Sequence, residues 1–311
     1  MIFFDFISTK VNEKLCKILI AIKNCSILIE QKISYASFEN SLGTIDNINA
    51  SGDVQKKLDV IANDIMIKEL TDTNYCSVLL SEENEEPIIL DKKFNKGKYI
   101  IAFDPLDGSS NIDCNCSIGT IFSIYEDIHN SYLIKGDNII CSGYILYGPV
   151  TEFVLTYGNN NGVHKFTLNR KLEDFLYTGD IKIPTNGKNI YSINESNFEN
   201  WFDDMKQYIL QYKVKNTKYT QRYIGSMVGD VHRTLLYGGM FCYPADNKNQ
   251  NGKLRLIYEC GPISKIIEEA GGKSIVGNKS IERILNIIPT EIHQKTSIIL
   301  GSTIEVEKYK L

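Results

Sequence analysis

The sequence predicts an α/β protein with two lobes, and three observations lead to this prediction. The chain has 311 residues, and chains of this length usually divide into units of roughly 100–200 residues. Two segments with helical periodicity come first, and short β-branched and aromatic runs follow them. We expect an N-terminal lobe at residues 1–180, which holds the early helices and a mobile loop, and a C-terminal lobe at residues 181–311.

The two early helices are expected at residues 11–31 and 53–70. In each segment the apolar residues recur on one helical face. Asp53 stands where its side chain could cap the second helix. Residues 34–51 between them are rich in Ser, Asn, Gly and Thr, which predicts a loop long enough to be functional.

Strands are expected at residues 75–80 and 98–103, and each runs directly into carboxylates. Glu82 and Glu83 follow the first of these strands, while Asp104 and Asp107 follow the second. Further strands are predicted at residues 118–125, 143–146, 151–156 and 190–193. Later helices are predicted at residues 222–236 and 262–270, the second closed by a Gly-Gly pair.

Composition excludes several classes of protein. The formal net charge of −4 and the pI of about 5.7 argue against nucleic-acid binding, which usually needs a strongly basic surface. The eight cysteines form no C-x-x-C pair, so we expect neither a zinc cluster nor a disulfide framework. We find no signal peptide and no apolar run of membrane-spanning length. We therefore expect a cytoplasmic protein without a membrane partner.

The most informative motif is the run of residues 104–111, Asp-Pro-Leu-Asp-Gly-Ser-Ser-Asn. Asp104 and Asp107 offer hard oxygen ligands for Mg²⁺, and Gly108, Ser109 and Ser110 would let phosphate oxygens approach the backbone. The alternative is an ordinary β-turn, which Asp-Pro and Asp-Gly pairs form for local reasons. A turn needs only four residues, so the longer run favours a functional site.

Each of the other candidate site residues, taken alone, could also have a purely structural role. Glu82 and Glu83 could be a solvated acidic turn, and Asp53 and Asp59 could be a helix cap and a polar-face acid. Glu259 could complement a helix dipole. A second phosphate would need cationic donors far from the metal, but most surface cations bind no ligand; the candidates are Arg222, Lys253 and Arg255.

Taken together, these segments resemble the class I fructose-1,6-bisphosphatases of animals, fungi and plants. The resemblance runs from about residue 52 to residue 301. It is carried by residues 52–59 (GDVQKKLD), 103–114 (FDPLDGSSNIDC), 191–195 (YSINE), 222–227 (RYIGSM) and 252–259 (GKLRLIYE).

The resemblance implies a layered α/β/α/β/α fold and Mg²⁺-dependent hydrolysis of the 1-phosphate of fructose 1,6-bisphosphate, a step of gluconeogenesis. Mn²⁺ is a possible substitute for Mg²⁺. Asp59 and Glu83 would activate the attacking water. The implied metal ligands are Asp53, Glu82, Glu83, Asp104, the carbonyl group of Leu106, Asp107 and Glu259.

The resemblance also assigns the substrate contacts. Asp107, Gly108, Ser109 and Ser110 would surround the reacting 1-phosphate. The 6-phosphate would be bound by Asn194, Arg222, Tyr223, Tyr243 and Lys253, and Met227 and Leu254 would line the sugar. In the family, the arginine that matches Arg222 reaches in from a neighbouring subunit, so the resemblance implies a homotetramer.

Regulation is where the sequence departs from the family. The Thr-Gly-Glu-Leu-Thr-like stretch of AMP-inhibited members is missing, and Glu126 stands in place of an arginine, although Lys98 and Tyr99 match a vestigial AMP site. An acid opposite a phosphate repels it, so we predict weak or absent AMP inhibition. The cysteine-bearing insertion of plastid members is also missing, which argues against that kind of redox control.

The nearest alternative activity is that of sedoheptulose-1,7-bisphosphatase, which shares the metal site and differs around the sugar and the distal phosphate. Residues 222–227 and the surroundings of Tyr243 look like the fructose form. An inositol-phosphatase-like monophosphatase would have no use for Lys253 and Arg255, and a non-enzymatic role would not require the intact set of carboxylates.

Overall fold

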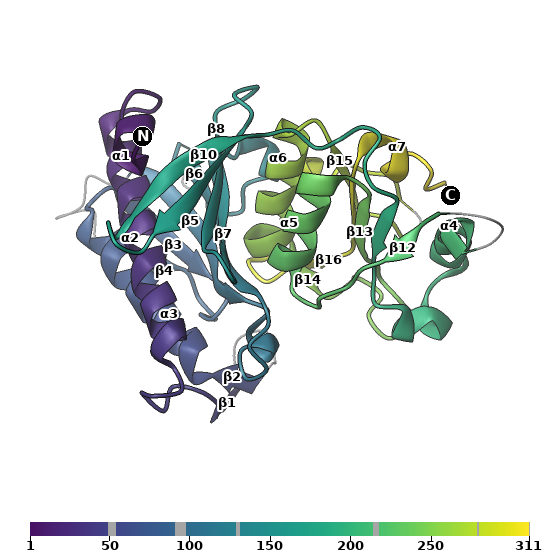
Figure 1. Cartoon of the computed structure of the whole chain (residues 1–311), viewed down its shortest axis with the longest axis horizontal. Helices are drawn as coiled ribbons and strands as arrows, with labels where there is room; N and C mark the ends of the chain where they lie inside the picture. The colour runs from purple at the N-terminus through teal and green to yellow at the C-terminus, as the bar shows by residue number, and fades with distance from the viewer. Residues whose placement is uncertain (49–53, 91–97, 129–130, 214–217, 279, 311) are drawn as a thin grey trace.

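The structure is a computed structural model, and it describes residues 1–48, 54–90, 98–128, 131–213, 218–278 and 280–310. Five layers follow one another across the molecule: helices, a large sheet, helices, a smaller sheet and outer helices (Figure 1). The expected α/β/α/β/α arrangement is therefore confirmed.

The large sheet has eight strands in the order β10-β9-β8-β7-β6-β5-β3-β4. Only β3 and β5 pair in parallel, and the other neighbours are antiparallel. The strands are β3 (Cys76–Ser81), β4 (Ile88–Ile89), β5 (Tyr99–Asp107), β6 (Ile118–Glu126), β7 (Cys141–Tyr147), β8 (Glu152–Tyr157), β9 (Val163–Asn169) and β10 (Asp174–Ile181).

Three helices cover the outer face of this sheet: α1 (Phe3–Ile7), α2 (Glu13–Tyr35) and α3 (Lys57–Asp72). Asn12 caps α2 by accepting a hydrogen bond from the backbone amide of Leu15 at 3.0 Å. The apolar faces of these helices and of the sheet form one continuous core. Burying such a face stabilises the lobe by roughly 25 cal/mol for each Å² of apolar surface removed from water.

The middle layer consists of α5 (Met227–Tyr237) and α6 (Gly261–Glu269), which pack between the two sheets. The smaller sheet has the order β12-β11-β13-β17-β15, and α4 (Asp203–Lys213) and α7 (Thr303–Val306) cover its far face. Its strands are β11 (Ile190–Ser192), β12 (Thr220–Gln221), β13 (Met240–Tyr243), β15 (Lys273–Ile275) and β17 (Ile298–Gly301).

Two small two-stranded sheets complete the fold. One pairs β1 (Thr44–Ile48) with β2 (Val54–Lys56), and the other pairs β14 (Leu254–Arg255) with β16 (Lys295–Thr296). The β1–β2 pair lies at the lower end of the N-terminal lobe, below α3, whereas β14 and β16 lie nearer the centre of the molecule (Figure 1). Strand β2 ends three residues before Asp59, and β14 ends four residues before Glu259.

Several local predictions need correction. The predicted helix at 53–70 begins only at Lys57, because residues 54–56 form β2, so a cap from Asp53 is wrong. The predicted loop at 34–51 includes the last turn of α2 and the strand β1. Residues 104–107 are not a turn after a strand but the end of β5, where the pairing with β6 shifts register.

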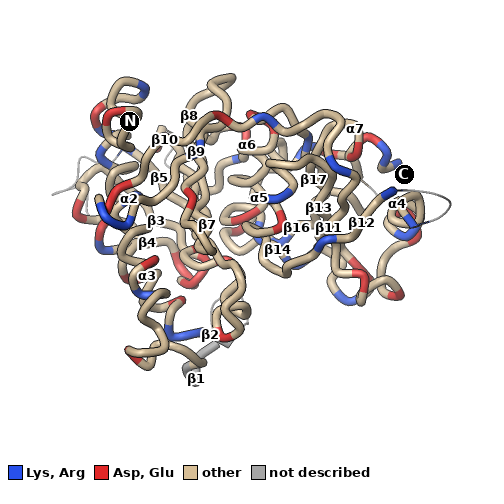
Figure 2. The backbone as a smooth tube through the Cα atoms, in the orientation of Figure 1, with Lys and Arg blue, Asp and Glu red and all other residues tan. Residues whose placement is uncertain are grey.

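Lys and Arg alternate with Asp and Glu along both halves of the chain (Figure 2). None of the described helices combines the length and the apolar character that a membrane span requires.

Candidate active site

Parallel pairing of β3 and β5 brings the first two acidic pairs to one edge of the large sheet. Ser81 lies opposite Phe103, and the backbone amide of Glu82 donates a hydrogen bond to the carbonyl group of Phe103 at 3.1 Å. Parallel strands end at the same sheet edge. Glu82 and Glu83 therefore lie beside Asp104, as their positions after the two strands predicted.

Three carboxylates from distant parts of the chain meet at this edge. One carboxylate oxygen each of Asp104, Asp107 and Glu259 lies within 4.8 Å of the other two, and all three residues are buried. Glu259 belongs to the single π-helical turn Leu256–Cys260 that leads into α6. The amide of Arg255 donates to Oε2 of Glu259 at 2.6 Å and fixes its direction.

The electrostatics of this cluster favour a bound cation. Burial raises the pKa of Asp104 and of Glu259 well above the ordinary range, and the negative charge of Glu82 raises both further. Burial also raises the pKa of Asp107, although hydrogen bonds from Val228 and Ser226 oppose this. Buried carboxylates this close repel one another, and a divalent cation with oxygen ligands would relieve the repulsion. The donor set therefore fits Mg²⁺.

Asp59 and Glu83 lie beside the cluster. The amide of Lys56 donates to Oδ2 of Asp59 at 2.8 Å, while the buried Oδ1 has no hydrogen-bond partner among the described residues. Burial is the main cause that raises the pKa of Asp59 to about 7, and the charge of Glu83 adds to it. Gln55 donates to Glu83 at 2.6 Å. Asp59 can therefore exchange a proton near neutral pH.

The N-terminus of α5 holds Asp107 from the other lobe. Ser226, the N-cap residue, donates its hydroxyl group to Oδ2 of Asp107 at 2.9 Å, and the amide of Val228 donates to the same oxygen at 2.9 Å. Gly108 has φ 77°, and a Cβ atom there would lie 2.8 Å from Cβ of Ser226. Only glycine fits this turn without strain.

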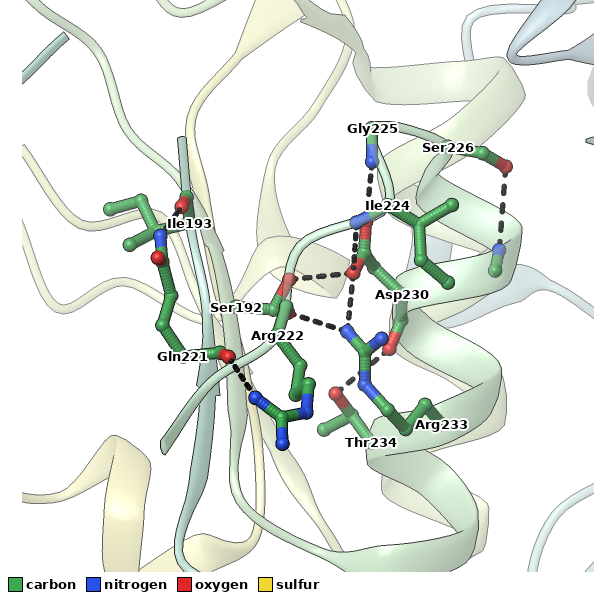
Figure 3. Close-up of polar contacts among 11 residues, drawn as sticks. Ser192, Ile193, Gln221, Arg222, Ile224, Gly225, Ser226, Asp230, Arg233 and Thr234 are labelled. Atoms are coloured by element: carbon green, nitrogen blue, oxygen red, sulfur yellow. Dashed lines mark hydrogen bonds and ion pairs between the residues drawn. The ribbon is translucent and has the colours of Figure 1, made fainter. Parts of the chain in front are cut away.

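A buried carboxylate that the sequence analysis missed organises the segment before α5. Asp230 is fully buried and accepts hydrogen bonds from the Ser192 hydroxyl at 2.7 Å and from the amides of Ile224 and Gly225 at 3.0 Å. The guanidinium group of Arg233 pairs with it at 2.5 Å (Figure 3). The one feature of the sequence that could have indicated this role is that Asp230 follows Ser226, the residue at the start of the helix, by four positions.

The residues predicted to bind the distal phosphate separate into two groups. Asn194, Tyr243 and Lys253 line one pocket. Tyr223 is half-buried beside Tyr243, and its pKa rises to about 12, mainly because of burial. The pocket belongs to the C-terminal lobe, and none of the three clustered carboxylates lines it.

Two arginines stand outside that pocket. Arg222 is exposed, and its guanidinium group donates to the carbonyl group of Gln221 at 2.9 Å (Figure 3). Arg255 is buried, with Nε 3.9 Å from a carboxylate oxygen of Glu82. The sequence suggested Arg255 as a donor to the distal phosphate. Its position is better suited to pairing with the acidic cluster.

The remaining candidates take varied positions. Met227 is buried at the start of α5 and Leu254 is half-buried in β14. Ser109 and Ser110 begin a 3₁₀ turn directly after Gly108. Leu106 is buried between the two aspartates of β5. Asp53, one of the expected metal ligands, lies outside the described residues.

The proposed vestigial nucleotide site is divided between surface and interior. Lys98 is exposed, but Tyr99 is buried, and its hydroxyl group exchanges hydrogen bonds with Asn12 at the start of α2. Glu126 is exposed opposite Tyr99 in the β5–β6 pairing.

Comparison with known proteins assigns the chain to a family. The model described as "Fructose-1-6-bisphosphatase, N-terminal domain" matches residues 6–180, and the model of the C-terminal domain matches residues 183–311. The chain belongs to the fructose-1,6-bisphosphatase family. The resemblance seen in the sequence is thereby confirmed.

Relatives of this family match almost the whole chain. A cytosolic fructose-1,6-bisphosphatase of Oryza sativa subsp. indica is 46% identical over 292 residues, covering 91% of this chain and 84% of the relative. A class 1 fructose-1,6-bisphosphatase of Persephonella marina is 46% identical over 295 residues, covering 93% and 89%.

Solved structures of a fructose-1,6-bisphosphatase from Leishmania major also match. The holo form superposes with a TM-score of 0.94 at 40% identity, over 99% of this chain and 97% of that one. The apo form gives a TM-score of 0.88 at 37% identity, with the same coverage. The conformation described here is thus nearer to that of the holo form.

Proposed function

We propose that the protein hydrolyses the 1-phosphate of fructose 1,6-bisphosphate to give fructose 6-phosphate and inorganic phosphate. Family membership supports the activity, and the convergence of Asp104, Asp107 and Glu259 within 4.8 Å is the single observation that supports the chemistry. Its relatives include enzymes named as cytosolic, which supports a role in cytoplasmic carbohydrate metabolism.

The proposed metal site combines this cluster with Glu82, Glu83, Asp53 and the carbonyl group of Leu106. Mg²⁺ would supply positive charge beside the reacting phosphate and lower the pKa of water that it binds. Mn²⁺ offers similar oxygen chemistry.

Side chains and backbone groups of the protein would bind the reacting phosphate and accept the proton of the attacking water. Gly108, Ser109 and Ser110 would hold the reacting phosphate with backbone amides and hydroxyl groups, since the glycine leaves room for its oxygens. Asp59, whose pKa lies at about 7, would accept the proton of the attacking water, with Glu83 beside it.

The other end of the substrate would be fixed by the pocket of Asn194, Tyr243 and Lys253, together with Tyr223. Met227 and Leu254 would contact the sugar. Holding the distal phosphate orients the reacting one, which is worth several kcal/mol in well-placed reactions. The exposed position of Arg222 supports a role in a neighbouring subunit, and we propose a homotetramer on this ground.

Phosphate release from purified protein tests the proposal. Fructose 1,6-bisphosphate with Mg²⁺ should be turned over, and the reaction should stop when EDTA removes the cation. A large preference for sedoheptulose 1,7-bisphosphate in the same assay would replace the proposed substrate with the alternative one.

A pair of matched variants tests the site. Glu83→Gln should reduce kcat by about 100-fold or more, as is typical when a proton-transfer group is lost. Glu85→Gln changes an exposed acid of the same segment and should leave kcat unchanged. Equal activity of the two variants would contradict the assignment of Glu83.

A further inference from the structure

Two exposed cysteines follow directly after the turn that carries Gly108, Ser109 and Ser110. Cys114 and Cys116 are exposed, whereas the other six cysteines are buried: Cys16, Cys25, Cys76, Cys141, Cys242 and Cys260. All eight lie within the described ranges. A dissolved thiol reagent can therefore reach only this pair in the folded protein.

Burial also makes the other thiols unreactive. It raises the pKa of Cys76 to about 12 and raises the pKa values of Cys25 and Cys141 further. Only the thiolate form is a good nucleophile. Burial thus favours reaction at the exposed pair in two ways: it blocks access to the other thiols, and it keeps them protonated.

The local backbone folds the two exposed cysteines into one tight turn. Asn115 between them has φ 56°, a left-handed conformation that turns the chain. The Cys114 thiol and the amide of Cys116 both donate to the carbonyl group of Asn111, at 3.3 and 3.1 Å. The Cys116 thiol donates to the carbonyl group of Cys114 at 3.9 Å, and the neighbouring Cys114 raises the pKa of Cys116.

Cys116 is also open to a small molecule, and Cys114 is exposed beside it. Cys116 lines a cavity of about 590 Å³ together with Tyr147, Thr151 and Arg170. The side chain of Arg170 keeps 54% of its surface exposed while it pairs with Glu30. A small anionic disulfide finds both room and a cation there.

The same segment connects parts of the proposed active site. Asp113, next to Cys114, accepts hydrogen bonds from the amide of Gly43 at 3.2 Å and from Nζ of Lys56 at 2.6 Å. Lys56 in turn holds Asp59 through its backbone amide. On the other side, the amide of Asn111 donates to the carbonyl group of Gly108 at 2.8 Å.

We propose that Cys114 and Cys116 form a dithiol modification site that low-molecular-weight disulfides such as oxidised glutathione convert reversibly into an intramolecular disulfide. The thiolate of Cys114 attacks one sulfur of the reagent, forms a mixed disulfide and releases one thiolate. Cys116 then loses its proton to solvent and attacks the sulfur of Cys114. The second thiolate leaves, so two cysteines are oxidised and one disulfide is reduced to two thiols.

The disulfide should lower the activity proposed above. It removes the S–H group that Cys114 donates to Asn111, and so loosens the turn that positions Ser109 and Ser110. Displacing the groups that hold a reacting phosphate by a fraction of an ångström is expected to cost about tenfold in kcat/KM. This consequence rests on the proposed function, whereas the modification itself does not.

The test uses the full chain, reduced and then equilibrated in glutathione buffers of graded redox ratio at pH 8. After quenching by alkylation, peptide mapping by mass spectrometry should show a disulfide between Cys114 and Cys116 and no bound glutathione. Cys114→Ser and Cys116→Ser should each carry one mixed disulfide on the remaining thiol. Glutathione on both wild-type cysteines at once, or two cysteines that stay as free thiols in the most oxidising buffer, would overturn the proposal.

Activity measured on the same samples separates the two proposals. Wild-type protein should lose activity in oxidising buffer and regain it with a reducing dithiol, while Cys114→Ser, whose hydroxyl group can still donate to the carbonyl group of Asn111, should keep its activity. A disulfide without loss of activity would refute the link to the active site. Inactive reduced protein would refute the proposed function, and the mapping result would still stand.

Discussion

Asp59 should make the metal-free protein less stable as the pH rises from 5 to 8. Burial raises its pKa from 3.8 to about 7 in the folded state, so the folded protein retains a proton that the unfolded chain has already lost. Stability is then lost as the pH rises toward the folded-state pKa. The full slope is 1.36 kcal/mol per pH unit and falls to half at pH 7, so Asp59 alone accounts for about 2 kcal/mol between pH 5 and pH 7.

Urea unfolding in EDTA at several pH values measures this effect. Other groups also titrate in this range, including His293, whose pKa is lowered mainly by burial, so the useful quantity is the difference between wild type and Asp59→Asn. The variant should lack the contribution of Asp59 to the change of unfolding free energy with pH, because asparagine carries no charge. Its carbonyl oxygen can still accept the hydrogen bond from the amide of Lys56.

Mg²⁺ provides the matching control for the wild-type protein. A bound cation offsets the charges that accumulate above pH 7, so Mg²⁺ should stabilise the protein more at pH 8 than at pH 5. Identical pH slopes for wild type and Asp59→Asn, or a wild-type stability that rises relative to the variant, would refute the reasoning.

Three further predictions concern positioning and regulation. Asp230→Asn replaces an acceptor of several buried hydrogen bonds, so it should destabilise the protein by about 3 kcal/mol and raise KM. Ser192→Ala should destabilise it by only about 1 kcal/mol, and equal unfolding midpoints of the two variants would contradict this. Gly108→Ala places Cβ against Ser226 and should reduce kcat/KM by at least about tenfold, while wild-type kinetics would show that the turn has room. AMP should not inhibit at low micromolar concentration, because Glu126 would repel its phosphate, and half-inhibition in that range would disprove this.

Local patterns were sufficient to predict the parts of the fold that depend on neighbours in sequence. The helix α2, the strands β3, β5, β6, β7 and β8, and the N-terminal Pro of α6 follow from periodicity and from turn or cap residues. The run from Asp104 to Asn111 indicated metal and phosphate chemistry because so many suitable residues are contiguous. The sequence as a whole also identified the family.

Sequence patterns failed where longer-range contacts decide the structure. The segment after residue 53 has helical periodicity, but its first residues pair with β1 as a strand instead. Strands β9, β10, β13, β15 and β17 were missed, because their burial depends on sheet neighbours and on helices from distant segments.

For the site, the sequence by itself determined which residues carry the chemistry, since carboxylates, glycine and small hydroxyl residues are recognisable by type and spacing. Only the tertiary structure decided that Glu259 joins Asp104 and Asp107, that Ser226 and Asp230 hold the junction, and that Cys114 and Cys116 are the exposed thiols. The physical reason is that pairing of β3 with β5 and packing of α5 and α6 against the large sheet bring together groups more than 100 residues apart.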